Sequence, residues 1–127
     1  MKIVHVVAAI IKKDGKILAT KRGYGEFENL WESLGGKIES GETPEIALIR
    51  EIKEELDASI NIDKFLVNVN YDYPTFHLDM DCYLCSLNSD ISLLEHKDAC
   101  WISQDEFDSL EWIPADISVL DAVRKEL

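Results

Sequence analysis

Short apolar runs interrupted by charged residues dominate the first part of the chain. Residues 3–22, "IVHVVAAIIKKDGKILATKR", contain two such runs separated by Asp14 and Gly15. An Asp-Gly pair accommodates the positive φ angles of a tight two-residue hairpin turn. The pattern therefore predicts two β-strands joined at Asp14 and Gly15.

The spacing of apolar residues changes to a helical period after a loop at residues 23–36, "GYGEFENLWESLGG". Thr43 is suited to cap a helix, Pro44 to its first position and Glu45 to the positive end of its dipole. We expect this helix to run to about Leu56. The apolar residues gather on one side of this helix: Leu48, Ile49, Ile52 and Leu56. The charged residues lie on the other side, with Ala47 among them: Arg50, Glu51, Glu54 and Glu55.

The second half of the chain predicts further strands and two helices. Residues 60–88 alternate like strands and are broken near Pro74. Residues 103–110, "SQDEFDSL", predict a short helix capped by Ser103, and Pro114 starts a final helix. This order of elements predicts an α/β fold, a sandwich built on a mixed sheet, as a single domain over residues 1–127.

Composition limits the classes of protein that fit. The chain has 127 residues, 46% hydrophobic and 30% charged, which suits one globular domain. It contains no apolar run long enough for a membrane span and its first residues do not form a secretory signal, so we expect no membrane partner and a cytoplasmic location. The formal net charge of −12 argues against a nucleic acid polymer as partner, because that mode of binding needs clustered cations.

Cys82 and Cys85 form an isolated CxxC pair within a segment that alternates like a strand. Their odd spacing places the two side chains on opposite faces. Reduced, buried thiols are therefore favoured over a zinc site.

The crowded acidic face of the first helix allows two interpretations. A solvated charged surface is the ordinary one. The alternative is a site for divalent cations, because Mg²⁺ is commonly held by a few carboxylates together with substrate phosphates. The preceding pair, Gly35 and Gly36, favours the second interpretation since it lets the backbone approach a ligand closely.

The spacing of the polar residues resembles the motif of a known family. Gly36, five residues, Glu42, seven residues, then Arg50, Glu51, Ile52, Lys53, Glu54 and Glu55 match the Nudix box, here about residues 36–58. Asp57 replaces the glycine of the motif and Ala58 its larger apolar residue. The chain is thus similar to MutT-like and CTP pyrophosphohydrolase-like Nudix hydrolases, which implies an α/β/α sandwich around a mixed sheet. We also expect the helix to end near Leu56 with Asp57 at or near positive φ.

The resemblance implies a Mg²⁺ or Mn²⁺ site and assigns its ligands. The metal-binding groups would be the Gly35 carbonyl and the carboxylates of Glu51, Glu54, Glu55 and Glu95, and Arg50 would orient the glutamates. Glu51 or Glu95 would accept a proton as general base, and the sequence does not choose between them. A solvated loop glutamate is the alternative for Glu95.

Substrate contacts are implied at several other positions. Arg22 and Lys37 are expected to meet the substrate, Arg22 at its phosphates, although Arg22 also fits a surface charge at a strand end. Asp116 takes the place of a base-contacting residue and would favour cytosine or guanine types; as an alternative it simply suits the first turn of a helix. The candidates for stacking on the base are Trp112, Phe27, Tyr24 and Trp31, for which simple packing is the alternative.

The implied reaction is hydrolysis of a (deoxy)nucleoside triphosphate to a nucleoside monophosphate and pyrophosphate. Nucleotide-pool sanitation, acting on 8-oxo-dGTP or on modified or ordinary cytidine nucleotides, would be its role. The "PADI" segment resembles members directed at cytidine triphosphate, while "ESLGGK" departs from the "EFPGGK" of MutT-like proteins at Ser33 and Leu34. The alternatives are hydrolysis of a dinucleotide or nucleotide sugar and a catalytically silent nucleotide-binding domain. A homodimer is left open.

Overall fold

The computed structural model describes residues 1–23, 25–92 and 96–127. In chain order its elements are β1 (Lys2–Lys13), β2 (Lys16–Arg22), β3 (Trp31–Glu32), β4 (Leu34–Lys37), α1 (Pro44–Leu56), β5 (Ile60–Asp72), β6 (Phe76–Leu87), β7 (His96–Ile102), the 3-10 helix η1 (Gln104–Ser109) and α2 (Pro114–Arg124). None of the helices among these residues combines the length and the apolar character that crossing a membrane requires.

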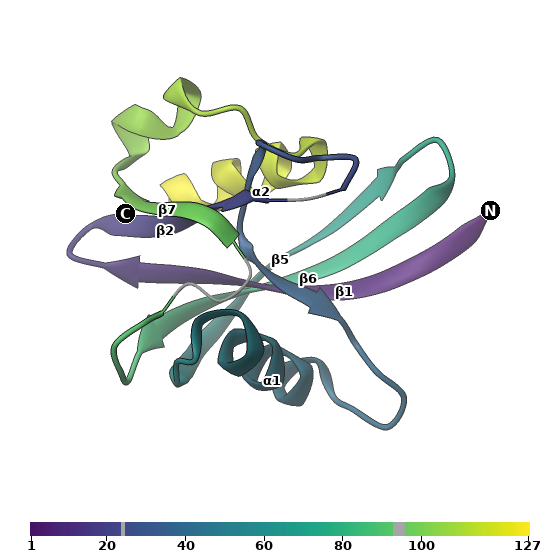
Figure 1. The fold of residues 1–127 in the computed structure, drawn as a ribbon, viewed down its shortest axis with the longest axis horizontal. Helices are drawn as coiled ribbons and strands as arrows, with labels where there is room; N and C mark the ends of the chain where they lie inside the picture. The colour runs from purple at the N-terminus through teal and green to yellow at the C-terminus, as the bar shows by residue number, and fades with distance from the viewer. Residues whose placement is uncertain (24, 93–95) are drawn as a thin grey trace.

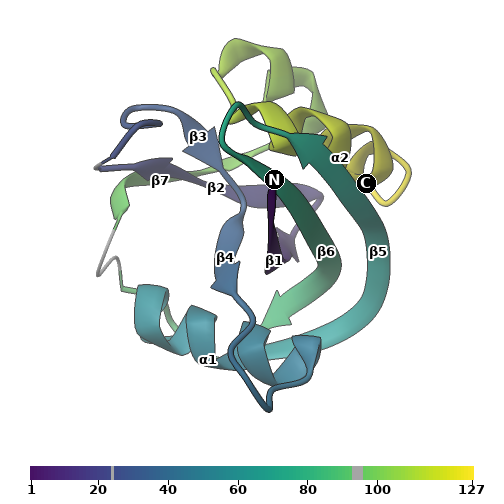
Figure 2. The same cartoon turned by 90° about the vertical axis from the view of Figure 1, so that its right-hand side faces the viewer.

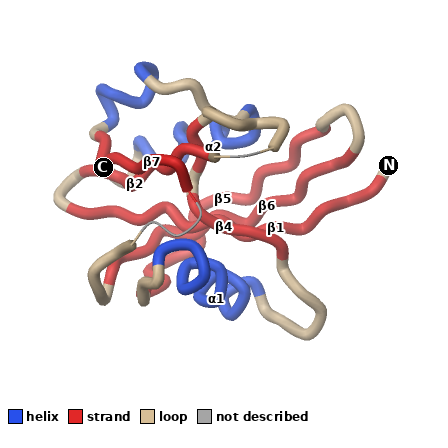
Figure 3. The backbone as a smooth tube through the Cα atoms, in the orientation of Figure 1, coloured by secondary structure: helices blue, strands red, loops and turns tan. Residues whose placement is uncertain are grey.

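The sheet is mixed and is organised around β1. β1 runs parallel to β6 and antiparallel to β4, while the end of β1 pairs with β2 in a hairpin. β5 pairs antiparallel with β6, and β2 is flanked by β3 and β7. Figure 3 shows the strands gathered at the centre of the molecule with the helices on either side. The predicted mixed sheet is confirmed.

The turns between strands follow the sequence signals. Asp14 and Gly15 both have positive φ, 51° and 77°, and close the β1–β2 hairpin as predicted. The break near Pro74 separates β5 from β6. Both predictions of a strand boundary are thus confirmed.

The two α-helices cover opposite faces of the sheet, α1 below and α2 above in Figure 1. Alternate residues of β1 pack on the two sides: Ala8 and Ile10 join the core beneath α2, whereas Val7 and Ala9 join the core beneath α1. Figure 2 shows β4, β6 and β5 curving between the two helices. The chain is therefore an α/β/α sandwich, as the sequence predicts.

The two cysteines of the CxxC pair are divided between these cores. Cys82 is buried on the α2 side and Cys85 on the α1 side. Burial raises the pKa of both thiols, that of Cys85 to about 12. Two thiols on opposite faces cannot hold one ion, so the structure agrees with reduced, buried cysteines.

Helix α1 has the predicted ends. The Thr43 side chain accepts a hydrogen bond from the Ile46 amide at 3.2 Å, and Pro44 occupies the first turn. Asp57 closes the helix in the left-handed conformation, with φ 49° and ψ 41°. Its amide donates to the Lys53 carbonyl at 3.0 Å, so the exit expected after Leu56 is confirmed.

The faces of α1 differ from the expectation at two apolar positions. Ile49 is 50% exposed, whereas Ala47 is completely buried. At about 100° per residue, Glu51 and Glu55 lie between Ala47 and Leu48 around the helix, both of which are buried. The small Ala47 side chain lets the helix pack closely on the sheet, so Glu51 and Glu55 border the buried face instead of standing opposite it.

The glycine pair was expected in a loop, and this is wrong. Gly35 and Gly36 lie within β4, where they pair with Ala8 and Val7 of β1. A Cβ on Gly35 would overlap the Val7 carbonyl oxygen, and a Cβ on Gly36 would overlap the Glu51 carboxylate. The glycines are required by close approach of β4 to β1 and α1, and not by a turn.

The two helices after residue 102 start where the sequence predicts, and the first of them is a 3-10 helix. η1 starts after Ser103, whose amide donates to the Glu106 side chain at 3.1 Å. α2 starts at Pro114 and ends at Arg124, three residues before the end of the chain. Tyr73, at the end of β5, accepts a hydrogen bond from the Ala115 amide at 3.2 Å and so ties the start of α2 to the sheet.

Candidate active site

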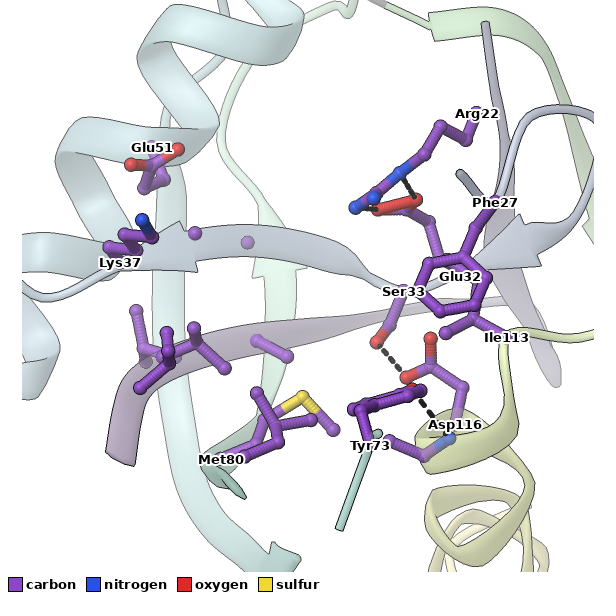
Figure 4. A pocket seen from close by; sticks show the side chains of 18 of the residues that line it. Arg22, Phe27, Glu32, Ser33, Lys37, Glu51, Tyr73, Met80, Ile113 and Asp116 are labelled. Atoms are coloured by element: carbon purple, nitrogen blue, oxygen red, sulfur yellow. Dashed lines mark hydrogen bonds and ion pairs between the residues drawn. The ribbon is translucent and has the colours of Figure 1, made fainter. Parts of the chain in front are cut away.

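A pocket of about 410 Å³ lies where β1, β4 and α1 meet the start of α2. One end carries Glu51, Glu55 and the backbone of Gly35 and Gly36. The other end carries Asp116 and a set of aromatic and polar side chains. Figure 4 shows Glu51 and Lys37 at one side of this pocket and Arg22, Glu32, Tyr73 and Asp116 at the other.

Arg50 organises the acidic end. Its guanidinium donates twice to the Glu42 carboxylate, at 2.7 and 2.9 Å, and also to Glu51 at 2.9 Å and Glu54 at 3.3 Å. A further hydrogen bond to the Lys37 carbonyl at 3.0 Å ties the helix to the end of β4. The repulsion among the crowded glutamates is thereby offset by one cation with five donors in a fixed plane.

The ion pair between Arg50 and Glu42 shifts the pKa values of both side chains. The bidentate hydrogen bond from Arg50, assisted by the Glu39 amide, lowers the pKa of Glu42 from its usual 4.5 to about 2. The same hydrogen bond with Glu42 raises the pKa of Arg50. Glu42 therefore stays ionised across the physiological range and holds Arg50 in place.

The glutamates of the box differ in their access to the pocket. Glu51 and Glu55 line it, and Glu55 is only 6% exposed. Glu54 is outside the lining and its side chain is 53% exposed. Glu95 lies outside the described residues, as does Tyr24.

Oxygen donors at the acidic end fit a hard divalent cation. Two pocket carboxylates and the backbone beside them are the donor set that Mg²⁺ takes when substrate phosphates complete its shell. Among the described residues, no three His, Cys, Asp or Glu side chains are grouped closely enough to hold a metal by themselves.

Asp116 and Ser33 are the central polar pair of the opposite end. Asp116 is 6% exposed, and its Oδ1 accepts a hydrogen bond from the Ser33 hydroxyl at 2.8 Å. Burial, partly offset by the hydrogen bond from Ser33, raises the pKa of Asp116 from 3.8 to about 7. Asp116 is therefore a pocket residue and not merely a surface carboxylate in a first helical turn.

Arg22 lies beside this pair and not beside the acidic glutamates. It donates to the Glu32 carboxylate at 2.7 and 3.1 Å, a bidentate ion pair. Figure 4 shows the pair across the pocket from Glu51. Its expected contact with phosphates stays a prediction, whereas Lys37 lies near Glu51 at the acidic end.

Aromatic side chains form the wall near Asp116. Tyr73 lies 5.0 Å from the Phe76 ring and 5.3 Å from the Phe27 ring, and all three line the pocket. Trp112 does not line it, and its indole N–H donates to the Phe107 carbonyl at 2.8 Å. The structure thus brings Phe27 to the site and leaves Trp112 outside it.

Sequence reasoning missed Glu32, Tyr73, Phe76 and Met80 among the residues of the pocket, and it named Ser33 only as a departure from the MutT-like pattern. One usable signal was the aromatic pair on either side of Pro74, at the turn between two strands. Another was the charged residue Glu32 inside an otherwise apolar stretch before the glycines. Neither signal shows which distant segment the side chain meets.

The fold and the pocket define an α/β/α sandwich in which an acidic helix and a glycine-containing strand lie across one pocket from an aromatic wall. The NUDIX domain model matches residues 1–123, and the chain therefore belongs to the Nudix hydrolase family. It is 32% identical to the CTP pyrophosphohydrolase of Escherichia coli strain K12, over 96% of this chain and 92% of that protein. It is also 32% identical to the 8-oxo-dGTP diphosphatase of Haemophilus influenzae, over 98% of this chain and 94% of that protein.

Solved structures agree. The solution structure of the E. coli ORF135 protein has a TM-score of 0.88 and 31% identity, covering 98% of this chain and 91% of that one. A Nudix-family MutT protein from methicillin-resistant Staphylococcus aureus 252 has a TM-score of 0.79 and 36% identity, with complete coverage of both chains. The α/β/α fold and the family are thereby confirmed.

Proposed function

We propose that this protein is a divalent-metal-dependent nucleoside triphosphate pyrophosphohydrolase. The observation that carries the proposal is a single pocket with the box carboxylates Glu51 and Glu55 at one end and Asp116 beside an aromatic wall at the other. Such a pocket suits a ligand that is anionic at one end and aromatic at the other. The relatives named for CTP and 8-oxo-dGTP hydrolysis support this class of substrate.

In the reaction, water attacks a phosphorus of the triphosphate and the bridging P–O bond breaks. The products are a nucleoside monophosphate and pyrophosphate. Mg²⁺ or Mn²⁺, held by the Gly35 carbonyl and by Glu51, Glu54 and Glu55, would neutralise phosphate charge and lower the pKa of water. Arg50 orients the glutamates and offsets their mutual repulsion through its hydrogen bonds to Glu51 and Glu54. Glu51, or Glu95 as the alternative, accepts the proton released by the attacking water.

The base end determines which nucleotide fits. Phe27 and Tyr73 supply ring faces for a base. When ionised, Asp116 only accepts hydrogen bonds, which favours bases with amino groups, such as cytosine and guanine types. Lys37, beside Glu51, is positioned to meet phosphate oxygens.

A substrate panel tests the proposal. Ordinary, oxidised and methylated nucleoside triphosphates, a dinucleotide and a nucleotide sugar are compared with Mg²⁺ by kcat/KM, with separate assays for pyrophosphate and phosphate. We expect pyrophosphate release from triphosphates and its loss in Glu54→Gln and Glu51→Gln. A preference for the dinucleotide or nucleotide sugar would instead assign the alternative activity, and binding without any turnover would assign a silent nucleotide-binding domain.

A further inference from the structure

Ser33 is the single residue between β3 and β4, and its side chain reaches a helix 83 positions away in the sequence. Neighbouring residues of an extended chain point to opposite sides. Leu34 packs in the core beneath α1, so Ser33 faces the other side, where α2 begins. There its hydroxyl donates to Oδ1 of Asp116 at 2.8 Å, as Figure 4 shows.

The groups around Asp116 push its charge state in opposite directions. Burial and the nearby carboxylate of Glu32 favour the protonated acid, while Arg22 favours the carboxylate. Burial raises the pKa of the Tyr73 hydroxyl and of the Cys82 thiol, and the charge of Asp116 adds to both shifts. Against this background the Ser33 hydroxyl and the Ser33 amide stabilise the charged form of Asp116.

We propose that Ser33 is a positioning residue for base selection: its hydroxyl occupies Oδ1 of Asp116, directs Oδ2 to the base, and holds the carboxylate in its accepting state. This inference rests on the proposed function and adds a residue that acts through Asp116. A serine hydroxyl donates one hydrogen, and that hydrogen is used on Oδ1. The hydroxyl remains a donor to Oδ1 only while that oxygen carries no proton, so this hydrogen bond disfavours protonation at Oδ1.

The charge of Asp116 then determines which group at position 4 of a pyrimidine is preferred. Cytosine presents an amino donor there, and uracil presents a carbonyl acceptor. An ionised Asp116 accepts from the amino group, while a protonated Asp116 donates to the carbonyl. The ratio of activity on CTP to activity on UTP should therefore fall as pH decreases through the titration of Asp116.

The first test measures the titration of Asp116 in the absence of substrate. The side-chain carboxyl of Asp116 is followed by ¹³C NMR as a function of pH in the wild type, Ser33→Ala and Ser33→Thr. Loss of a hydrogen bond to a charged acceptor predicts an upward shift of the midpoint by about 1–2 pH units in Ser33→Ala. Ser33→Thr keeps the hydroxyl and should restore the wild-type midpoint; an unchanged midpoint in Ser33→Ala would overturn the proposal.

The second test measures the selectivity between CTP and UTP. The ratio of kcat/KM for CTP to kcat/KM for UTP is measured from pH 6 to pH 9, since the ratio cancels effects of pH that are common to both substrates. At pH 7.5 we expect the ratio to fall roughly threefold or more in Ser33→Ala. The ratio should not depend on pH in Asp116→Asn, and Ser33→Ala should not change it further in that background.

The outcomes separate this inference from the proposed function. An equal loss of activity on both substrates, with an unchanged ratio, would reduce Ser33 to a structural role and overturn the selectivity claim. If no nucleoside triphosphate is hydrolysed, the proposed function fails. In that case an upward shift of the NMR midpoint in Ser33→Ala still supports the control of Asp116 by Ser33, and an unchanged midpoint still refutes it.

Discussion

At the scale of single residues, Arg50 explains why the chain tolerates its crowded glutamates. Like charges three or four positions apart on a helix cost about 0.2–0.5 kcal/mol per pair. One guanidinium donates hydrogen bonds to the carboxylates of Glu42, Glu51 and Glu54 and to the carbonyl of Lys37, and a further ion pair joins it to Glu39. The glutamates therefore depend on a geometry that only a planar, multivalent donor supplies.

Arg50→Lys should disable the site while the fold persists. A lysine ammonium cannot donate in a fork to Glu42 and also reach Glu51, so we expect kcat/KM to fall by about 10- to 1000-fold. The pKa of Glu42 should rise from about 2 toward 4.5. Because the lowered pKa of Glu42 stabilises the fold above about pH 4.5 and this contribution is lost toward pH 2, the variant should lose less stability on acidification. Lys53→Gln, which removes only an exposed ion pair with Asp57, is the control, and full activity of Arg50→Lys would contradict the role.

Asp116 has the opposite linkage between pH and stability. Its folded pKa of about 7 exceeds the usual 3.8, so the folded state retains a proton that the unfolded chain releases. Stability from this group is complete below about pH 4 and declines as pH rises toward 7, by about 4 kcal/mol at most. Asp116→Asn, which cannot ionise, should match the wild type near pH 4 and exceed it near pH 8 in urea unfolding. A difference that does not change with pH would refute this linkage, and Asp105→Asn at an exposed position controls for the loss of a surface carboxylate.

At the scale of elements, β4 shows two different uses of adjacent glycines. A Cβ at Gly35 would collide with the Val7 carbonyl of the neighbouring strand, whereas the atoms nearest to a Cβ at Gly36 belong to the Glu51 carboxylate. The first glycine allows strands to pair closely, and the second leaves room for a functional side chain. Equivalent substitutions at the two positions should therefore have different effects.

We expect Gly36→Ala to reduce activity and Gly35→Ala to reduce stability. Displacing Glu51 by about 1 Å can cost on the order of 100-fold in rate, while α1 and β4 stay in place. The methyl group added in Gly35→Ala must disrupt the pairing of β4 with β1. The melting temperature of Gly35→Ala should therefore fall more than that of Gly36→Ala. Circular dichroism melting and kcat/KM for both variants test the contrast, and it fails if Gly36→Ala retains the activity of the wild type.

The end of α1 predicts a stabilising substitution. Asp57 adopts the left-handed conformation that a glycine adopts at lower cost. Asp57→Gly should raise the free energy of unfolding by about 0.5–1 kcal/mol, reduced slightly by loss of the exposed ion pair with Lys53. Asp57→Ala is the matched comparison and should be less stable than the wild type. Equal stability of the glycine and alanine variants would show that the conformation carries no cost.

The sequence predicts those parts of the fold that depend on local chemistry. The turn at Asp14, the cap at Thr43, the start of α2 at Pro114 and the left-handed Asp57 all follow from preferences within a few residues. The misplaced features depend on contacts between distant segments. Gly35 and Gly36 look like a turn until β1 is placed beside them, and the burial of Ala47 follows only once α1 lies on the sheet.

The same division holds for the site. The resemblance to the Nudix box implies that Arg50 contacts the glutamates, which lie on the same helix or just before it. It cannot predict that Arg22 pairs with Glu32, or that Ser33 meets Asp116, because strand pairing and the docking of α2 determine those contacts. The base end of the pocket is consequently the part that sequence alone describes least well.

At the scale of the whole molecule, the site combines a strong negative charge with an anionic substrate. The chain carries a formal net charge of −12, and the pocket presents Glu51 and Glu55 at one end. Triphosphate would be repelled from this end unless cations intervene. Under the proposed function, charge balance therefore gives the divalent cation a second role beside its chemical one.

Binding of Mg²⁺ should therefore stabilise the folded protein even without substrate. A ligand that binds only the folded state adds about 2.7 kcal/mol at a concentration one hundred times its dissociation constant. We expect the melting temperature to rise with MgCl₂ well beyond the rise in NaCl of equal ionic strength, because general screening acts on all charges alike. Glu51→Gln and Glu55→Gln should lose most of this magnesium-specific increment, whereas Asp108→Asn, whose side chain is 97% exposed beside α2, should keep it. An increment that is the same in all variants would place the cation elsewhere on the acidic surface and would contradict the assignment of the metal site to α1.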